Sequence, residues 1–147
     1  MTEGLGIGAS LRRKEDARFL FGQGRYVGDI ARPGLLEVAF LRSPVAHALL
    51  KGVTKPSGAE HRVFTLADLP GVRTIRANSA LPGFRVSEQP PLAEGKLRHV
   101  GEAIAACVAD TRAEAEDLAA ACVLDYQALP AVHDMLLAPL PDAPLVH

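Results

Sequence analysis

The stretch Arg42-Ser43-Pro44-Val45-Ala46-His47 directly follows an apolar run, Leu35-Leu36-Glu37-Val38-Ala39-Phe40-Leu41. A short apolar run bounded by a turn signal indicates a buried strand, so we expect one over residues 35–41. Proline disfavours the helical conformation in the residue before it, and the strand should therefore end in a turn at Ser43-Pro44. The polar side chains of this turn are gathered directly after a strand.

Further elements follow from local patterns. Residues 103–109 are apolar on both faces, which predicts a central strand. Thr111 and Glu114 form a capping box that starts a helix over 111–122, whose apolar positions repeat with helical spacing. Shorter strands are expected at 48–53, 61–65, 72–77, 97–100 and 123–126, with a long loop over 78–95. The sequence thus predicts an α+β fold, with a mixed sheet, one well-capped helix and several short strands.

Residues 1–32 show neither a helical nor a strand period. They form a basic N-terminal arm with apolar anchors, and the basic residues are Arg12, Arg13, Lys14, Arg18 and Arg25. Such a segment must dock on a surface to become ordered. We therefore divide the chain into an arm over 1–32 and a folded domain over 33–147, a single domain overall.

Composition limits the class of protein. The chain has 147 residues and a net charge of −1, which gives no electrostatic case for nucleic acid or an anionic membrane as partner. No apolar stretch approaches the roughly 20 residues that span a bilayer. Two cysteines are too few for a disulfide scaffold, so we expect a reduced, cytoplasmic setting and no membrane span.

Three patterns suggest chemistry and are outweighed by structural explanations. Ser43 and His47, with Asp29 or Asp68, would make a hydrolytic triad, but no exposed nucleophile elbow surrounds Ser43, whose hydroxyl should bond a nearby backbone group. Cys107 beside His99 would make a thiolate pair, but an apolar setting favours core packing. The run Gly4-Leu5-Gly6-Ile7-Gly8-Ala9 lacks the preceding strand that a dinucleotide fingerprint needs.

Metal ligation has no local signature. The five histidines are scattered, and no H-x-H, H-x-x-x-H or C-x-x-C pair places two ligands together. We assign no catalytic, cofactor-binding or metal residue to this chain.

The order of several motifs resembles one known family. The segment Arg42-Ser43-Pro44-x-Ala46-His47 is followed by Val100-Gly101-Glu102-x-Ile104-Ala105 and then by Asp125-Tyr126-x-x-Leu129-Pro130. This succession is similar to the N-terminal α/β-hammerhead domain of the molybdopterin-binding large subunit of xanthine dehydrogenases and aldehyde oxidases. The first part, residues 12–30, looks most like the carbon monoxide dehydrogenase large chain.

The resemblance implies a part of an oxidoreductase that is inactive by itself. In that family the molybdopterin contacts lie further along the large subunit, and iron–sulfur and FAD groups sit in partner subunits. The expected partners are therefore a molybdenum-binding domain or subunit and the iron–sulfur and flavin subunits. We expect Arg42, Ser43, Pro44 and His47, with the loop 78–91, to face the docking interface. The alternative is a stand-alone binding or assembly module with the same fold.

Overall fold

The structure is a computed structural model that describes residues 7–10 and 13–147. The chain divides into two units, Met1–Leu35 and Leu36–His147, and each is described by itself. The described part of the first unit contains the helix α1 (Asp16–Leu20) and the 3-10 helix η1 (Val27–Asp29). The absence of any helical period over 1–32 was therefore misleading, because a helix of five residues is too short to display one.

Two aromatic rings organise the first unit. Phe19 and Tyr26 stack with their ring centroids 6.0 Å apart. Gly24 lies against both rings, and a Cβ at that position would meet Phe19 Cδ1 at 3.1 Å. A side chain at position 24 would therefore require these rings to shift by a few tenths of an ångström.

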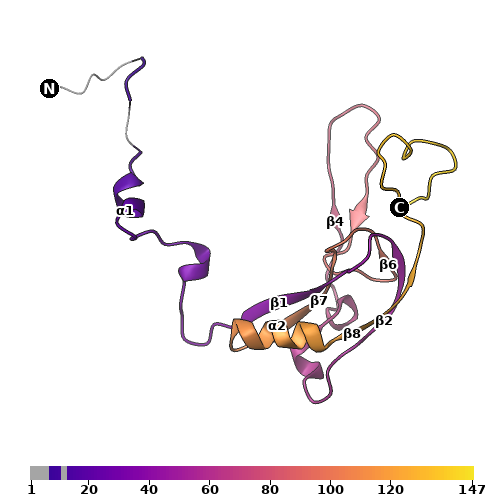
Figure 1. Cartoon of the computed structure of the whole chain (residues 1–147), viewed down its shortest axis with the longest axis horizontal. Helices are drawn as coiled ribbons and strands as arrows, with labels where there is room; N and C mark the ends of the chain where they lie inside the picture. Colours follow the sequence, from indigo (N-terminus) through magenta and orange to yellow (C-terminus); the bar gives the residue numbers. More distant parts are fainter. Residues whose placement is uncertain (1–6, 11–12) are drawn as a thin grey trace. The chain divides into compact units, whose positions relative to one another are not determined.

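The second unit contains three small antiparallel sheets (Figure 1). The first has the order β1 (Glu37–Arg42), β7 (Ala103–Ala109) and β3 (Val63–Phe64). The second has the order β6 (Lys96–Leu97), β2 (Ala48–Thr54) and β8 (Val123–Ala128). The third pairs β4 (Ile75–Arg76) with β5 (Glu88–Gln89). The 3-10 helices η2 (Glu60–Arg62) and η3 (Leu66–Asp68) flank β3.

The α+β class is confirmed, but the described strands do not form one mixed sheet. A mixed sheet needs a parallel pair, and the connection of β7 to β8 through α2 (Arg112–Ala121) could have supplied one. Instead β8 pairs antiparallel with β2 in the other sheet. The tertiary pairing of β8 therefore decides the sheet type.

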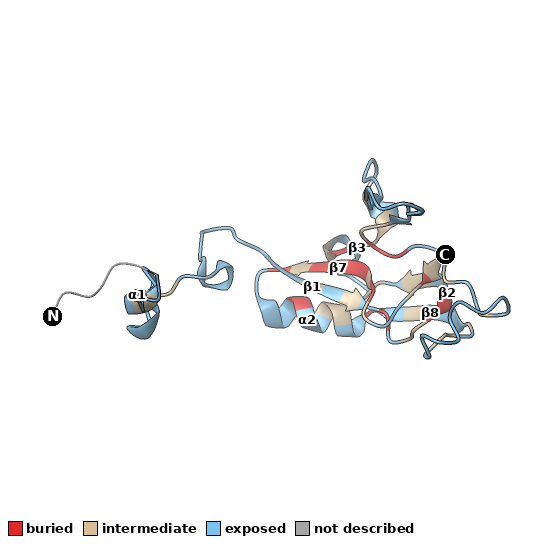
Figure 2. Ribbon diagram, turned by 90° about the horizontal axis from the view of Figure 1, so that it is seen from above, coloured by how far each residue is buried: buried red, intermediate tan, exposed pale blue. Residues whose placement is uncertain are grey.

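The predicted central strand and capped helix are both confirmed. β7 lies between β1 and β3, and Figure 2 shows buried residues along its length. Thr111 Oγ1 accepts a hydrogen bond from Glu114 N at 3.2 Å, and Glu114 Oε2 accepts one from Thr111 N at 3.3 Å. The helix α2 packs across β1 and β7.

β1 is less buried than its apolar sequence predicted. Val38 and Phe40 are 49% and 44% exposed to solvent. The strand also begins at Glu37 rather than at Leu35. Val38 and Phe40 are paired with Val108 and Ala106 on one face of the sheet. Ala105 and Cys107 are buried on the opposite face, because successive side chains of a strand alternate between the two faces. Only the face with Ala105 and Cys107 packs against α2. The prediction that the strand after Pro33-Gly34 is buried is therefore wrong for the face with Val38 and Phe40.

The core consists of two small clusters. One contains Ala48, Ala93, Leu97 and Ile104. The other contains Val63, Ala105, Cys107 and Cys122. Leu41 and Val53 pack against both clusters, so the two sheets are joined by apolar contacts.

The remaining strands are present but differ in length. The strands expected over 48–53 and 123–126 are confirmed as β2 and β8, each slightly longer than predicted. Those expected at 61–65, 72–77 and 97–100 are each reduced to two residues. The segment 78–95, predicted to be a loop, contains β5 and part of a hairpin with β4.

Candidate functional site

The turn after β1 is held to the loop before β7. A register shift between Leu41 and Arg42 ends the regular pairing of β1 with β7. Arg42 Nη1 then donates to Gly101 O at 2.8 Å, and the guanidinium carbon lies 5.3 Å from the centre of the Phe40 ring. Arg42 is itself exposed, and its guanidinium group lies over the ring of Phe40, which is also exposed.

Ser43 is buried and bonded on all sides by backbone groups. Its Oγ donates to Val45 O at 2.7 Å, as expected for a serine in a turn. Its N–H donates to Glu102 O at 2.9 Å, and its carbonyl accepts from Gly101 N at 2.8 Å. This reciprocal pair fixes the turn against residues 101–102.

His47 links the same turn to the end of β8. It is 5% exposed, and its Nδ1 lies 2.6 Å from Pro130 O. Because a carbonyl can only accept, Nδ1 carries the proton of this bond. The His47 carbonyl accepts from Leu129 N at 2.9 Å. Among the described residues, His47 Nε2 is the one buried side-chain nitrogen or oxygen without a hydrogen-bond partner.

Glu102 is a functional candidate to which the sequence reasoning gave no role. It is 3% exposed, and its carboxylate accepts from Arg98 N at 2.6 Å and from Arg98 Nη1 at 2.9 Å. The i,i+4 spacing of Arg98 and Glu102 was visible in the sequence, but it falls outside any helix and gave no signal. The pair stabilises the loop to which Arg42 and Ser43 bind.

The candidate residues of a hydrolytic triad each bond a group outside such a triad. Ser43 Oγ is bonded to Val45, and His47 Nδ1 to Pro130. Asp29 accepts from Tyr26 N at 2.8 Å within η1, while Asp68 is paired with Lys55. Within residues 36–147 no hydrogen bond joins Ser43 Oγ to His47 or Asp68, and the expected bond from the Ser43 hydroxyl to a nearby backbone group is confirmed.

The four residues expected at a docking interface differ in accessibility. Arg42 and Pro44 are exposed, whereas Ser43 and His47 are buried and bonded within the domain. The buried pair can therefore only shape the turn, and the exposed pair can contact a partner. Their docking role stays a prediction.

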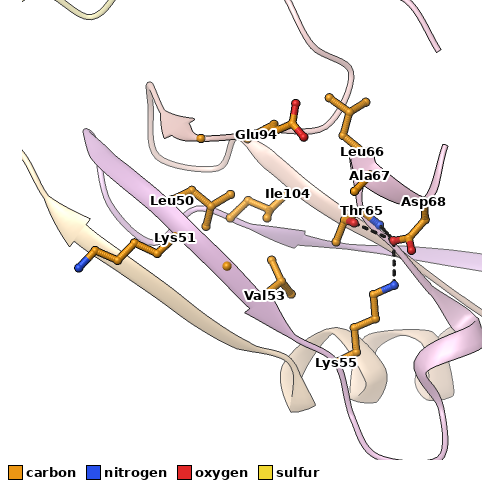
Figure 3. Close-up of a pocket in the computed structure, with 13 residues that line it drawn as sticks. Leu50, Lys51, Val53, Lys55, Thr65, Leu66, Ala67, Asp68, Glu94 and Ile104 are labelled. Carbon is orange, nitrogen blue, oxygen red and sulfur yellow. Dashed lines mark hydrogen bonds and ion pairs between the residues drawn. The ribbon is translucent and has the colours of Figure 1, made fainter. Parts of the chain in front are cut away.

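A cavity of about 300 Å³ lies beside β2 and is lined by residues of β2, η3 and the segment 93–95 (Figure 3). Lys55 Nζ donates to Asp68 Oδ2 at 2.7 Å on one side of it. Figure 3 shows the Lys51 side chain directed away from Asp68. The cavity therefore presents one ion pair and an apolar wall that includes Val53 and Ile104.

The electrostatics of this cavity disfavour acid–base chemistry. The hydrogen bond from Lys55, followed by those from the Thr65 hydroxyl and amide, lowers the pKa of Asp68 to about 2. A carboxylate with so low a pKa is a weak base at neutral pH. The Asp68 side chain also caps η3, so its main contribution is structural.

The cysteines pack in the core, as the sequence predicted. Burial, followed by the nearby Cys122, raises the pKa of Cys107 to about 11. Both thiols are free, and Cys122 Sγ donates to Leu118 O at 3.3 Å. His99 Nδ1 instead bonds Val100 O, in agreement with the preference for core packing over a Cys107–His99 pair.

No metal or membrane feature emerges from the described residues. Within 7–10 and 13–147 there is no group of three or more histidine, cysteine or acidic side chains placed to bind a metal. No helix in the same residues combines the length and hydropathy needed to cross a bilayer. The first half of the glycine run, residues 4–6, lies outside the described residues.

Comparisons with known proteins identify relatives of this arrangement. A nicotine 6-hydroxylase large subunit of Paenarthrobacter nicotinovorans is 38% identical over 87% of this chain and 16% of its own length. The carbon monoxide dehydrogenase large chain of Hydrogenophaga pseudoflava is 34% identical over 90% of this chain and 17% of its own. The quinoline 2-oxidoreductase of Pseudomonas putida 86 superposes with a TM-score of 0.83 at 40% identity, over 93% of this chain and 18% of that one.

The chain spans about a sixth of the length of these curated relatives. The family model for the α/β-hammerhead domain of aldehyde oxidase and xanthine dehydrogenase matches residues 21–130, which include the Arg42–His47 turn, Glu102 and Pro130. The chain therefore belongs to the α/β-hammerhead family of aldehyde oxidases and xanthine dehydrogenases, within the molybdenum hydroxylases.

Proposed function

We propose that this chain is a structural, docking domain of a molybdenum hydroxylase large subunit and carries no catalytic residue of its own. The supporting observation is that the polar groups of the Arg42–His47 turn bond the domain's own backbone at Gly101, Glu102 and Pro130. Polar groups used in this way stabilise a surface and are not available for chemistry.

The molybdenum cofactor belongs to the remainder of the subunit in this proposal. A solved carbon monoxide dehydrogenase related to this chain is described as a Cu,Mo enzyme. The described residues here offer neither a metal-ligand cluster nor a cradle of unpaired buried polar groups, apart from the single His47 Nε2. These residues therefore fit a pterin cofactor poorly.

The partners follow from this role. In this proposal the chain docks on the molybdenum-binding domain or subunit. Iron–sulfur and flavin subunits are the further partners and transfer the electrons. The exposed Arg42 and Pro44 and the loop 78–91 form the contact side. Both cysteines are free, which agrees with a reduced, cytoplasmic setting.

The test is the native size of the complex that contains this chain in its own cells, with molybdenum assayed across the same fractions. Co-migration with molybdenum in a large assembly is the expected result. Migration near 15.6 kDa without molybdenum would contradict the proposal and favour a stand-alone module.

Substitution separates the two halves of the turn. Arg42→Ala in the complete enzyme should impair assembly or turnover while leaving the domain folded, because Arg42 is exposed. His47→Ala should destabilise the domain itself, because it leaves Pro130 O without its partner. Normal assembly and kinetics of the Arg42→Ala enzyme would count against docking through this turn.

A further inference from the structure

The hairpin formed by β4 and β5 concentrates positive charge. Residues 72–89, here called the arginine hairpin, contain Arg73, Arg76 and Arg85, and one acidic residue, Glu88. The Glu88 carboxylate accepts a hydrogen bond from Thr74 Oγ1 at 2.9 Å, within the hairpin. The hairpin thus has a net charge of +2 in a chain whose net charge is −1.

The three arginines are exposed, and none of them forms an ion pair among the described residues, although Arg76 lies opposite Glu88 across the β4–β5 pair. Two ion-paired arginines of the domain, Arg98 and Arg112, have their carboxylate partner four residues away, and a third, Arg62, is paired with Asp110. No carboxylate lies four residues from an arginine of the hairpin, and Glu88 bonds Thr74 instead.

Apolar side chains accompany this charge. The exposed ones are Val72, Ile75, Leu81, Phe84 and Val86, which retain 47%, 63%, 71%, 40% and 46% of their surface. Figure 1 shows the hairpin as a long excursion away from the strands of the domain. Its surface therefore offers arginine and apolar groups together, the combination that is enriched at protein interfaces.

The tip of the hairpin is an ordered turn. Phe84 N donates to Leu81 O at 3.2 Å, and Gly83 adopts a φ of 76°. Proline at the second position and a positive-φ glycine at the third are the requirements of a type II turn. The turn fixes Leu81 and Phe84 at its two ends, where both side chains are open to a partner.

We propose that the arginine hairpin inserts into an acidic, apolar-lined groove on the molybdenum-binding part of the large subunit. This inference rests on the proposed function and adds the chemistry of the surface that is recognised. Guanidinium groups without an ion-pair partner are complementary to carboxylates of a partner, and the five exposed apolar side chains are stabilised by a partner surface that buries them. A phosphate backbone supplies only the first, so a nucleic acid fits the hairpin less well.

Zero-length cross-linking in the native complex tests the contact. The hairpin contains no lysine, so Arg73→Lys, Arg76→Lys and Arg85→Lys each keep the charge and add the only amine there. Carbodiimide treatment should join these amines to aspartate or glutamate side chains of the molybdenum-binding part. Arg112→Lys on α2 is the matched control, because it should couple within the chain to Glu116.

Charge-reversal variants test how much the arginines contribute to the affinity. Arg76→Glu/Arg85→Glu should weaken association of the chain with the rest of the complex at least about tenfold at low salt, with a smaller effect as salt rises. Lys51→Glu/Arg112→Glu, which reverses two exposed charges elsewhere, should change the affinity less than about threefold.

The outcomes are distinct. A complex that still carries molybdenum but yields no cross-link from the hairpin lysines to its other parts overturns this inference and leaves the proposed function standing. Reversal that abolishes binding of a random-sequence duplex DNA probe while leaving the complex intact also overturns it. If the chain never co-migrates with molybdenum, both the proposed function and the docking of the arginine hairpin on the molybdenum-binding part are refuted.

Discussion

At the scale of single residues, Asp68 illustrates how local donors control a charge. Its hydrogen bonds from Lys55 and Thr65 lower its pKa from 3.8 to about 2. A lowered folded-state pKa adds stability that is present above the unfolded value and is lost as the pH falls. We therefore expect the wild-type advantage over Asp68→Asn to decline between about pH 4 and pH 2 in urea unfolding.

The control for this prediction is Lys55→Met. It removes the first cause of the shift, so carboxyl carbon NMR titration should place the Asp68 pKa closer to 3.8 than in the wild type. An unchanged Asp68 titration in that variant would mean that Thr65 alone sets the pKa. High salt should weaken the effect, since the pair is partly exposed.

The two cysteines lead to a prediction about reactivity. Burial raises the pKa of the Cys107 thiol to about 11 and also raises that of Cys122. The thiolate is the reactive form, so iodoacetamide at pH 8 should modify neither residue in the folded protein on the timescale that suffices in urea. Mass spectrometry gives the answer, and rapid native modification of Cys107 would contradict its place in the core.

At the scale of elements, the start of α2 is the clearest case of a local signal deciding structure. Thr111→Ala removes the side-chain acceptor of Glu114 N and should cost about 0.5–2 kcal/mol of unfolding free energy. Thr111→Ser keeps the hydroxyl and should recover most of the loss. Urea denaturation of both variants measures the difference, and equal stability of the two would argue against the capping box.

The strands show how far local signals reach. The apolar run of β7 correctly predicted a central position, because a strand buried on both faces needs apolar residues at every position. The same reasoning failed for β1, since α2 covers only one of its faces. The exposed face with Val38 and Phe40 is as apolar as the buried one, and the sequence does not reveal which neighbour is present.

At the scale of the whole molecule, both core clusters lie within residues 36–147. A truncated chain that begins at Leu36 should therefore keep the circular dichroism of β1–β8 and α2 and unfold with a midpoint close to that of the full chain. The measurement is urea unfolding of the two chains side by side. A truncated chain that no longer unfolds cooperatively would show that residues 1–35 contribute to the core.

The amino-acid sequence by itself determined β7, the capped helix α2, the serine-stabilised turn after β1 and, through the order of its motifs, the family. These depend on periodicity, capping and turn chemistry, which act over a few neighbouring residues. The tertiary structure alone decided the division into three antiparallel sheets, the open face of β1 and the partners of the turn. His47 and Pro130 are 83 positions apart, and Arg42 and Gly101 are 59 apart. Contacts at such separations depend on how the sheets pack, and no local pattern encodes them.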